Sequence, residues 1–256
     1  MLFVLAPPTP AQQLPAPDEL LARLYAYTAD YRATLPSLTC DESIVSQRLK
    51  HGKVKWEVRV ESTLREVRKT IPDHDDPFTE EHTFHTVNGK PPKENFEIPY
   101  FVQGGFANMV GFAHPERGPC IDYRVLAGEQ AGTVRLEMTP RADAGSANCA
   151  AVFKGYHGTI LADTETGRIL HSERTIAPEA ATRQREPYFA SVDYGPQELG
   201  GRSYWLPQRL FTHDNEDEAR MYATYSSCHR FGSEVRILPG VTEAAPDGGS
   251  PVPKPQ

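Results

Sequence analysis

Residues 54–61 alternate strictly between apolar and charged side chains, and this pattern constrains the fold more than any other feature of the chain. The apolar positions are Val54, Trp56, Val58 and Val60. Successive side chains of a strand point to opposite faces, so the pattern predicts a strand with one buried and one solvated face. Such alternation favours an antiparallel sheet over a parallel one. We expect the whole Trp56 stripe to lie in the core.

Strand patterns recur at short spacing along most of the chain and amount to about ten strands. Turn signals separate many of them, the clearest being His51-Gly52, Asn88-Gly89 and residues 163–167. Residues 71–79, rich in Asp and Pro, are expected to form a loop. Strands are expected over 41–50, 54–67, 80–86, 121–126, 133–139, 150–155, 156–162, 168–176, 188–194, 204–211, 219–225 and 230–238.

One amphipathic helix precedes the strands. We expect Asp18 to be its N-cap, and the helix to end before Pro36, because the residue ahead of a proline avoids the α region. Its apolar stripe consists of Leu20, Leu21, Leu24, Tyr27, Thr28 and Tyr31. A second, shorter apolar helix is expected within residues 104–113. Each helix has one apolar side, which must pack against the sheet.

A mostly antiparallel sheet of about ten strands must bury one face, so it either closes as a barrel or curls over its helices. The single apolar stripe of the first helix favours the curled form. We therefore predict an α+β protein, mostly antiparallel β, with a strongly curled single sheet or half-barrel wrapped over the N-terminal helix and the short second helix. One domain is expected over residues 17–238, followed by a disordered Pro/Gly-rich tail at 239–256.

The first residues are similar to the end of a secretory signal peptide. Residues 2–6 are apolar, and Thr9 and Ala11 would place small side chains before a cleavage after Ala11. A basic segment is missing and the apolar core is short. We interpret residues 1–16 as the remainder of a signal peptide whose start lies upstream, with a disordered arm as the alternative. The expected location is the periplasm or the exterior of the cell.

The four cysteines fit an exported protein. No pair has C-x-x-C spacing, which argues against a zinc knuckle or a thioredoxin-type site, and an even number allows two disulfides. Three connectivities are open. We favour Cys120–Cys149, which would close a local excursion, and Cys40–Cys228, which would tie the first strand to the last. The alternative is four buried thiols in a cytosolic protein.

Chemistry-bearing motifs are sparse. A His/Asp cluster could bind a metal, and His74, His82 and His85 lie near the acidic residues within 73–76. However, two positions three apart on a strand face opposite sides, so His82 and His85 argue against a metal site, and residues 73–77 are interpreted as a solvated acidic loop. Ser191 and Ser203 lack a G-x-S-x-G elbow, and no phosphate-binding loop is present. The carboxylates are scattered over strand faces that we expect to be exposed. We expect no catalytic residue, no metal and no cofactor, and hence a protein that is not an enzyme.

Charge and hydropathy narrow the choice of partners. A net charge of −7 argues against a dedicated nucleic-acid binder, which carries a basic stripe. No apolar run approaches the ~18 residues that a spanning helix needs, so we expect a protein that does not span the membrane. A monomer is expected.

A series of short motifs follows a characteristic order along the chain. They are 35–40 (LPSLTC), 87–90 (VNGK), 104–106 (GGF), 155–160 (GYHGTI), 163–169 (DTETGRI), 192–194 (VDY) and 201–207 (GRSYWLP). With these motifs residues 35–238 resemble a group of uncharacterised exported proteins common in Acidobacteria. Residues 158–207 are also similar to the LolA/LolB-like lipoprotein-carrier superfamily, in which a D-x-x-T-G hairpin precedes a G-x-x-Y-x-L-P strand.

The superfamily resemblance implies an incomplete β-barrel that wraps helices and binds acyl chains of lipoproteins or lipids, or senses envelope components. The shared motifs are turns and strand ends, in which Gly167 supplies the positive φ of a tight hairpin. They contain no ligand-binding residue. The resemblance therefore bears on the fold more than on function.

An apolar segment between the strands provides the candidate site. It is either a lid over a hydrophobic cavity, with Met and Phe adapting to acyl chains, or core that fills the open side of the sheet. Three tyrosines of the first helix carry the same two interpretations, namely Tyr25, Tyr27 and Tyr31. The candidate lid residues are Phe101, Val102, Phe106, Met109, Val110 and Phe112.

Two functions remain open at this point. The first is a periplasmic binding protein that holds a lipid, an acyl chain or a lipidated partner in the cavity of a half-barrel. The second is a structural or protein-interaction module of the cell envelope with a filled core and no small ligand. An internal cavity favours the first, and a tightly filled interior favours the second.

Overall fold

The computed structural model describes residues 14–73, 76–103, 106–141, 149, 156–176, 188–214 and 218–231. Within these residues ten strands form one antiparallel sheet in the order β3-β2-β1-β10-β9-β8-β7-β6-β5-β4. The strands are β1 (Leu38–Lys50), β2 (Lys53–Asp73), β3 (Asp76–Val87), β4 (Ile121–Ala127), β5 (Thr133–Pro140), β6 (Tyr156–Asp163), β7 (Ile169–Ile176), β8 (Tyr188–Leu199), β9 (Arg202–Asp214) and β10 (Ala219–Arg230).

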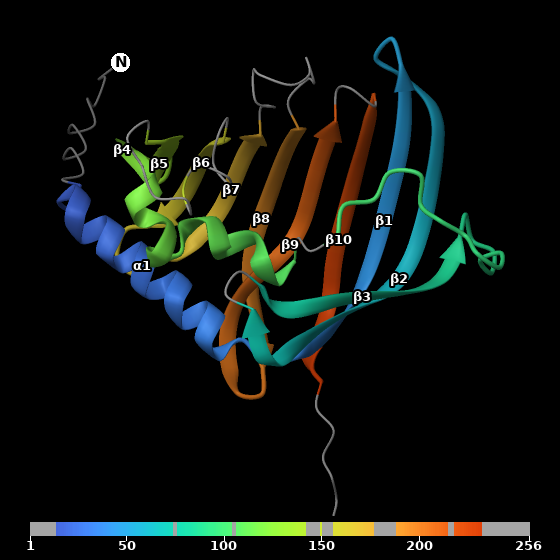
Figure 1. Cartoon of the computed structure of the whole chain (residues 1–256), viewed down its shortest axis with the longest axis horizontal. Coiled ribbons are helices and arrows are strands. Elements are labelled where there is room, and N and C mark those ends of the chain that lie inside the picture. Colours follow the sequence, from blue (N-terminus) through green and yellow to red (C-terminus); the bar gives the residue numbers. More distant parts are fainter. Residues whose placement is uncertain are drawn as a thin grey trace, which may run out of the picture.

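Two runs of consecutive strands make up the sheet. β1 to β3 form one run and β4 to β10 the other, and they join where β1 pairs with β10, with Ile44 opposite Ala223. β3 and β4 are the two edges, so the sheet is open. In Figure 1 the sheet curls, and α1 (Pro17–Thr34) lies across its concave side with two short 3-10 helices, η1 (Ala107–Ala113) and η2 (Pro115–Cys120). The predicted fold class, a curled antiparallel sheet over an N-terminal helix and a short second helix, is confirmed.

Two tight turns follow directly from their sequences: residues 51–52 join β1 to β2, and residues 88–89 end β3, where Val87 forms a single bridge with Lys90. His51 and Gly52 have φ of 51° and 73°, and Asn88 and Gly89 have φ of 50° and 74°. Positive φ at both central residues is the type I′ geometry that matches the twist of paired strands. Asn and Gly tolerate this geometry better than other residues, so the turn signals at 51–52 and 88–89 are confirmed.

The N-terminus of α1 differs from the expected one. The helix begins at Pro17, Ala16 is the N-cap residue, and no side chain caps the helix. Proline suits the first helical position, because its missing N–H would have no helical partner there. Asp18 is therefore not the N-cap but lies in the first turn with Glu19, where an acidic side chain is stabilised by the helix dipole.

Helix α1 is held at both of its ends. Near its N-terminus the Arg23 guanidinium donates to the carbonyl oxygen of Thr164, in the turn between β6 and β7. At its C-terminus Tyr204 of β9 donates to the carbonyl oxygen of Thr34 over 2.9 Å, and Arg68 Nε of β2 donates to the carbonyl oxygen of Leu35 over 2.8 Å. The helix thus spans the concave face from the β6–β7 turn to β2.

The structure corrects the expected loop at 71–79. β2 continues to Asp73 and β3 begins at Asp76, so most of this segment belongs to two long strands. At the other end of the chain β10 runs through Arg230, past the expected end of the strand at 225. The expected strand at 150–155, most of the strand at 230–238, most of the N-terminal arm and the tail at 239–256 lie outside the described residues.

The alternating stripe that opens β2 is buried in part. Val58 and Val60 belong to the core, but Val54 and Trp56 are 45% and 39% exposed. The prediction that the whole stripe lies in the core is therefore wrong for these two residues. Both lie beside the β1–β2 turn, and Figure 1 shows that end of the strands extending beyond α1 and η1. Alternation identifies the face of a strand, whereas the extent of its cover depends on distant segments.

Candidate functional site

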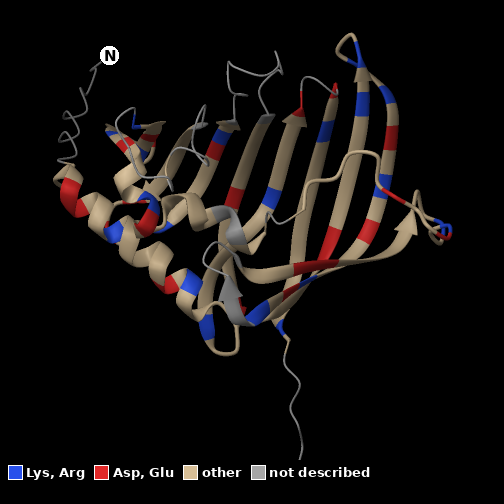
Figure 2. Cartoon of the chain, in the orientation of Figure 1, with Lys and Arg blue, Asp and Glu red and all other residues tan. Residues whose placement is uncertain are grey.

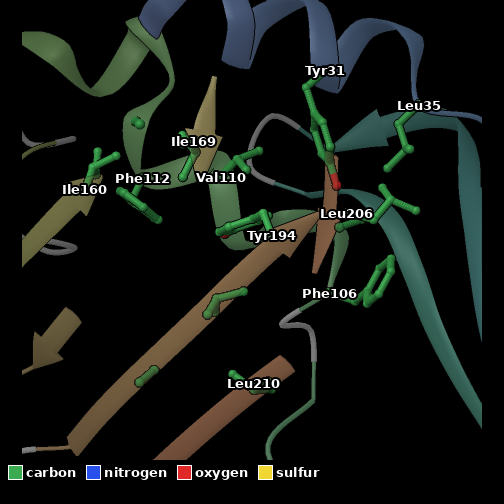
Figure 3. Close-up of a cluster of buried hydrophobic side chains, with 14 of the residues drawn as sticks. Tyr31, Leu35, Phe106, Val110, Phe112, Ile160, Ile169, Tyr194, Leu206 and Leu210 are labelled. Atoms are coloured by element: carbon green, nitrogen blue, oxygen red, sulfur yellow. The ribbon is translucent and has the colours of Figure 1, made fainter. Parts of the chain in front are cut away.

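An apolar layer lies between the concave face of the sheet and the elements that cover it. α1 contributes Leu20, Leu24 and Tyr31 to it, all buried. Figure 3 shows side chains of helix, 3-10 helix and strands meeting in this layer, among them Tyr31, Val110, Phe112, Ile160, Ile169, Tyr194 and Leu206. A hydrogen bond of 2.9 Å from Thr28 Oγ1 to the carbonyl oxygen of Ala113 ties α1 to η1 within the layer.

The candidate lid residues fall into two groups. Val110 and Phe112 are buried in the layer beneath α1, as is Tyr31, and Tyr27 is partly buried beside it. The second group lies toward β3, at the end of the segment that precedes η1, and consists of Phe101, Val102 and Phe106. There Phe101 packs edge-on against His82, with ring centroids 4.7 Å apart, and Phe106 packs against Tyr225 at 4.8 Å. The side chain of Met109 lies outside the described residues.

A buried polar cluster underlies the Phe101–Phe106 end of the cover. His82 of β3 lies between two carboxylates: its Nδ1 is 2.8 Å from Glu42 Oε2, and its Nε2 is 2.9 Å from Glu80 Oε1. Ser62 Oγ of β2 donates to Glu42 Oε2 over 2.7 Å. Acidic residues occur on β1, β2 and β3 in Figure 2, and the side chains of Glu42 and Glu80 are nearly inaccessible to solvent.

The two carboxylates decide the protonation of His82. Burial alone would lower the pKa of this imidazole, but the hydrogen bonds and negative charges of Glu42 and Glu80 outweigh it and raise the pKa to about 9. At neutral pH His82 is therefore a cation that donates to both carboxylates. Since both ring nitrogens are engaged, the cluster is suited to holding strands together rather than to proton transfer.

Buried carboxylates also fix the start of η1. The backbone N–H of Phe106 donates to Glu80 Oε2 over 3.1 Å, and the backbone N–H of Ala107 donates to Glu66 Oε1 over 3.1 Å. The first N–H groups of a helix have no partner within it, so acceptors from neighbouring strands satisfy them here. The segment with Val110 and Phe112 is thus anchored at one end to β2 and β3.

The sequence interpretation missed these carboxylates. Glu42 shares its strand face with the buried residues Cys40 and Ile44, and this two-residue period could have indicated that it points inward. The expectation that the acidic residues occupy exposed strand faces is therefore wrong for Glu42, and also for Glu66 and Glu80. His82, the partner of Glu42 and Glu80, lies close to Glu42 because β1 pairs with β2 and β2 with β3.

The predicted absence of a metal site concerned the histidines of the 73–85 region. Within the described part of the chain, no group of three or more His, Cys, Asp or Glu side chains is arranged to hold a metal ion. His82 faces the interior, whereas His85 is exposed and contacts Thr63 Oγ1 over 2.7 Å. His74 lies outside the described residues.

Both expected disulfides are present. Cys40 of β1 is bonded to Cys228 of β10, and Cys120 at the end of η2 is bonded to Cys149. The favoured connectivity is therefore confirmed. The first bridge joins the two runs of strands where they pair, and the second fixes the start of β4.

Comparisons with solved structures give matches over most of the chain. A domain described as an outer membrane lipoprotein-sorting protein from Vibrio parahaemolyticus is 10% identical, covers 85% of this chain and 94% of that chain, and has a TM-score of 0.46. A DUF1329 family protein from Desulfovibrio piger is 11% identical, with 84% and 94% covered and a TM-score of 0.39. A LolA superfamily protein from Nitrosomonas europaea is 10% identical, with 83% and 94% covered and a TM-score of 0.36.

The LolA superfamily is the one that the sequence resembles. All three matches have identities of 10–11% and TM-scores below 0.5. No family model matches the chain, and no curated protein matches it. Among the described residues, no helix is long and apolar enough to cross a membrane.

Proposed function

We propose that this chain is an exported, non-enzymatic binding protein that holds the hydrocarbon chain of a lipid or of a lipidated partner beneath α1 and η1. The observation that carries the proposal is the apolar layer between the sheet and its cover, which consists of α1 and η1. A hydrocarbon chain that enters such a layer leaves water, which stabilises the complex by ~0.8 kcal/mol per CH₂ group.

The attachment of the cover supports this proposal. Polar bonds hold α1 at its two ends, through Thr164 and Tyr204, and Thr28 ties its middle to η1 rather than to the sheet. Between these points Asp30 of α1 also pairs with Arg202 of β9, while the buried side chains Leu20, Leu24 and Tyr31 of the helix belong to the apolar layer. Apolar contacts have no fixed direction and can be exchanged for contacts with a ligand at small cost.

The disulfides support export. Structural disulfides form and persist in oxidising compartments, and rarely in the cytosol. Cys40–Cys228 and Cys120–Cys149 account for all four cysteines of the chain. We place the protein in the periplasm or outside the cell.

A cell-envelope interaction module with a filled core is the second candidate. It is favoured by the burial of Phe106 and Val110, which are 2% and 1% exposed, as core residues are. In that case the covering segment serves stability, and contacts with a partner would be made by other surfaces.

Native mass spectrometry of the exported protein, purified without lipid-stripping detergent, tests the choice. We expect a population with a bound lipid that dissociates on collisional activation, and an intact mass four hydrogens below that of the reduced chain. As a control, the protein is stripped of lipid, refolded with its disulfides intact and mixed with phosphatidylethanolamine/phosphatidylglycerol vesicles, which should restore the adduct. A lipid-free mass in both samples would reject the carrier function and leave the interaction module.

A further inference from the structure

Two tyrosine hydroxyl groups lie inside the protein without a hydrogen-bond partner among the described residues. They belong to Tyr27 and Tyr31, one turn apart on α1, whose ring centroids are 6.3 Å apart. Tyr31 is 2% exposed. In Figure 3 Tyr31 reaches from α1 into the apolar layer, with its oxygen toward the strands that carry Tyr194 and Leu206.

Such hydroxyls are unusual, because a buried phenol almost always finds an acceptor or donor. Leaving a polar group unpaired in an apolar interior costs stability that a Phe at the same position would not cost. Two such groups on adjacent turns, directed to the same layer, point to a partner outside the described residues.

The surroundings define what that partner can be. Burial is the main cause that raises the pKa of Tyr27 and of Tyr31, so both phenols stay protonated and can donate. Tyr194 is an electrostatic neighbour of both phenols; the Glu66 carboxylate further raises the pKa of Tyr31, and the Arg168 guanidinium lowers that of Tyr27. Arg168 stacks over Trp205 at 4.4 Å and lies 4.0 Å from Asp163 Oδ2, and its buried Nε has no hydrogen-bond partner among the described residues either.

We propose that the Tyr27 and Tyr31 hydroxyls donate hydrogen bonds to the neutral carbonyl oxygen of an acyl chain, an ester or an amide, held in the apolar layer. This inference rests on the proposed function and names the polar group of its ligand. A carbonyl oxygen has two lone pairs and can accept from both phenols. A free carboxylate would meet the Glu66 charge in a poorly solvated interior, which disfavours it. The neighbouring Tyr194 hydroxyl lies 3.5 Å from Ser172 Oγ.

The test uses the full-length, disulfide-bonded protein, with displacement of the uncharged dye N-phenyl-1-naphthylamine as readout. The competitors are dodecane, methyl decanoate, N-methyldecanamide and decanoate. The variants are Tyr27→Phe, Tyr31→Phe and the double substitution. Tyr25→Phe is the matched control, since it makes the same change on the same helix, where the Tyr25 ring packs against Tyr123 instead.

Wild-type protein should bind methyl decanoate or N-methyldecanamide at least tenfold more tightly than it binds dodecane or decanoate. A preference for methyl decanoate would indicate an ester-linked lipid, and a preference for N-methyldecanamide would indicate an N-acylated partner. Tyr31→Phe should weaken carbonyl binding about tenfold, the effect of one neutral hydrogen bond, and leave dodecane binding unchanged. Tyr25→Phe should change neither. In the ligand-free protein Tyr31→Phe should be at least as stable as wild type, because the hydroxyl that is removed has no hydrogen-bond partner among the described residues.

Other results would overturn the inference. A loss of stability in ligand-free Tyr31→Phe would show that the hydroxyl has a partner within the protein. Equal affinity of wild type for dodecane and methyl decanoate would reject carbonyl recognition, while the proposed binding of hydrocarbon would stand. If neither the dye nor any competitor binds, the proposed function itself fails and this inference with it.

Discussion

His82 and Glu42 form a 2.8 Å hydrogen bond between Nδ1 and Oε2, although their side chains are 5% and 1% exposed. With Glu80 on its other nitrogen, the imidazole joins β1 to β3 across β2. Charged groups inside a protein are tolerated when they are paired and hydrogen-bonded, as these are. Because Glu80 also accepts the N–H of Phe106, the cluster couples the sheet to the start of its cover.

The first prediction concerns pH. The pKa of His82 is raised to about 9 in the folded protein, against about 6.5 in an unfolded chain. A raised pKa gives stability that is fully present below pH 6.5 and is lost as the pH rises through 9. We expect urea unfolding to show a decrease on the order of 3 kcal/mol in unfolding free energy between pH 6 and pH 10 from this group.

The matched variants isolate that contribution. His82→Gln should be less stable at pH 6 and should lack this part of the pH dependence. His85→Gln, which changes an exposed histidine on the same strand, should keep it. An unchanged slope in His82→Gln would mean that His82 is not a buried cation at neutral pH.

The second prediction concerns the contact between α1 and the β6–β7 turn. Gly167 has φ of 70°, and a Cβ atom there would lie 2.3 Å from the carbonyl carbon of Arg23. Gly89 has a similar φ of 74° but open space around the position of a Cβ. Gly89→Ala should therefore cost about 1 kcal/mol, from backbone strain alone.

Gly167→Ala should cost at least 2–3 kcal/mol, because α1 must also move away from the turn. Chemical denaturation of the two variants measures both values. If Gly167→Ala and Gly89→Ala lower the unfolding free energy equally, then α1 does not pack closely on the β6–β7 turn.

The third prediction ranks the disulfides. Cys40–Cys228 spans 188 residues and Cys120–Cys149 spans 29. In the chain-entropy model, stabilisation grows with the loop that is closed, to roughly 5 kcal/mol for the first and roughly 3.5 kcal/mol for the second. The pair of Ala substitutions at Cys40 and Cys228 should therefore lower the melting temperature more than the pair at Cys120 and Cys149. The reverse order in calorimetry would show that native-state contacts, not loop closure, dominate.

Much of the fold could be predicted from the sequence because its signals are local. Tight turns such as His51-Gly52 are set by the φ of two residues, and the face of Val58 and Val60 is set by a two-residue period. The exposure of Trp56 could not be predicted in this way, because it depends on how far a helix some 25 residues earlier in the chain extends over the sheet.

The candidate site was harder to predict for the same reason. Glu42 and His82 are 40 positions apart and meet through the register of three strands, which no local pattern specifies. The aromatic character of Tyr27 and Tyr31 could be used to place them in the layer, but whether their hydroxyls find partners depends on side chains from distant strands, among them Glu66 of β2 and Tyr194 of β8. A binding site composed of distant side chains requires the tertiary structure.

The last prediction separates core from lid. Phe106 is buried against Tyr225, so Phe106→Ala leaves a cavity and should cost about 3–5 kcal/mol of unfolding free energy. Trp56→Ala removes a larger side chain, but from an exposed position, and should change the stability by no more than about 0.5 kcal/mol. Urea denaturation followed by circular dichroism measures both without depending on tryptophan fluorescence. If Phe106→Ala leaves stability unchanged while altering dye binding, then Phe106 belongs to a lid that opens rather than to the core.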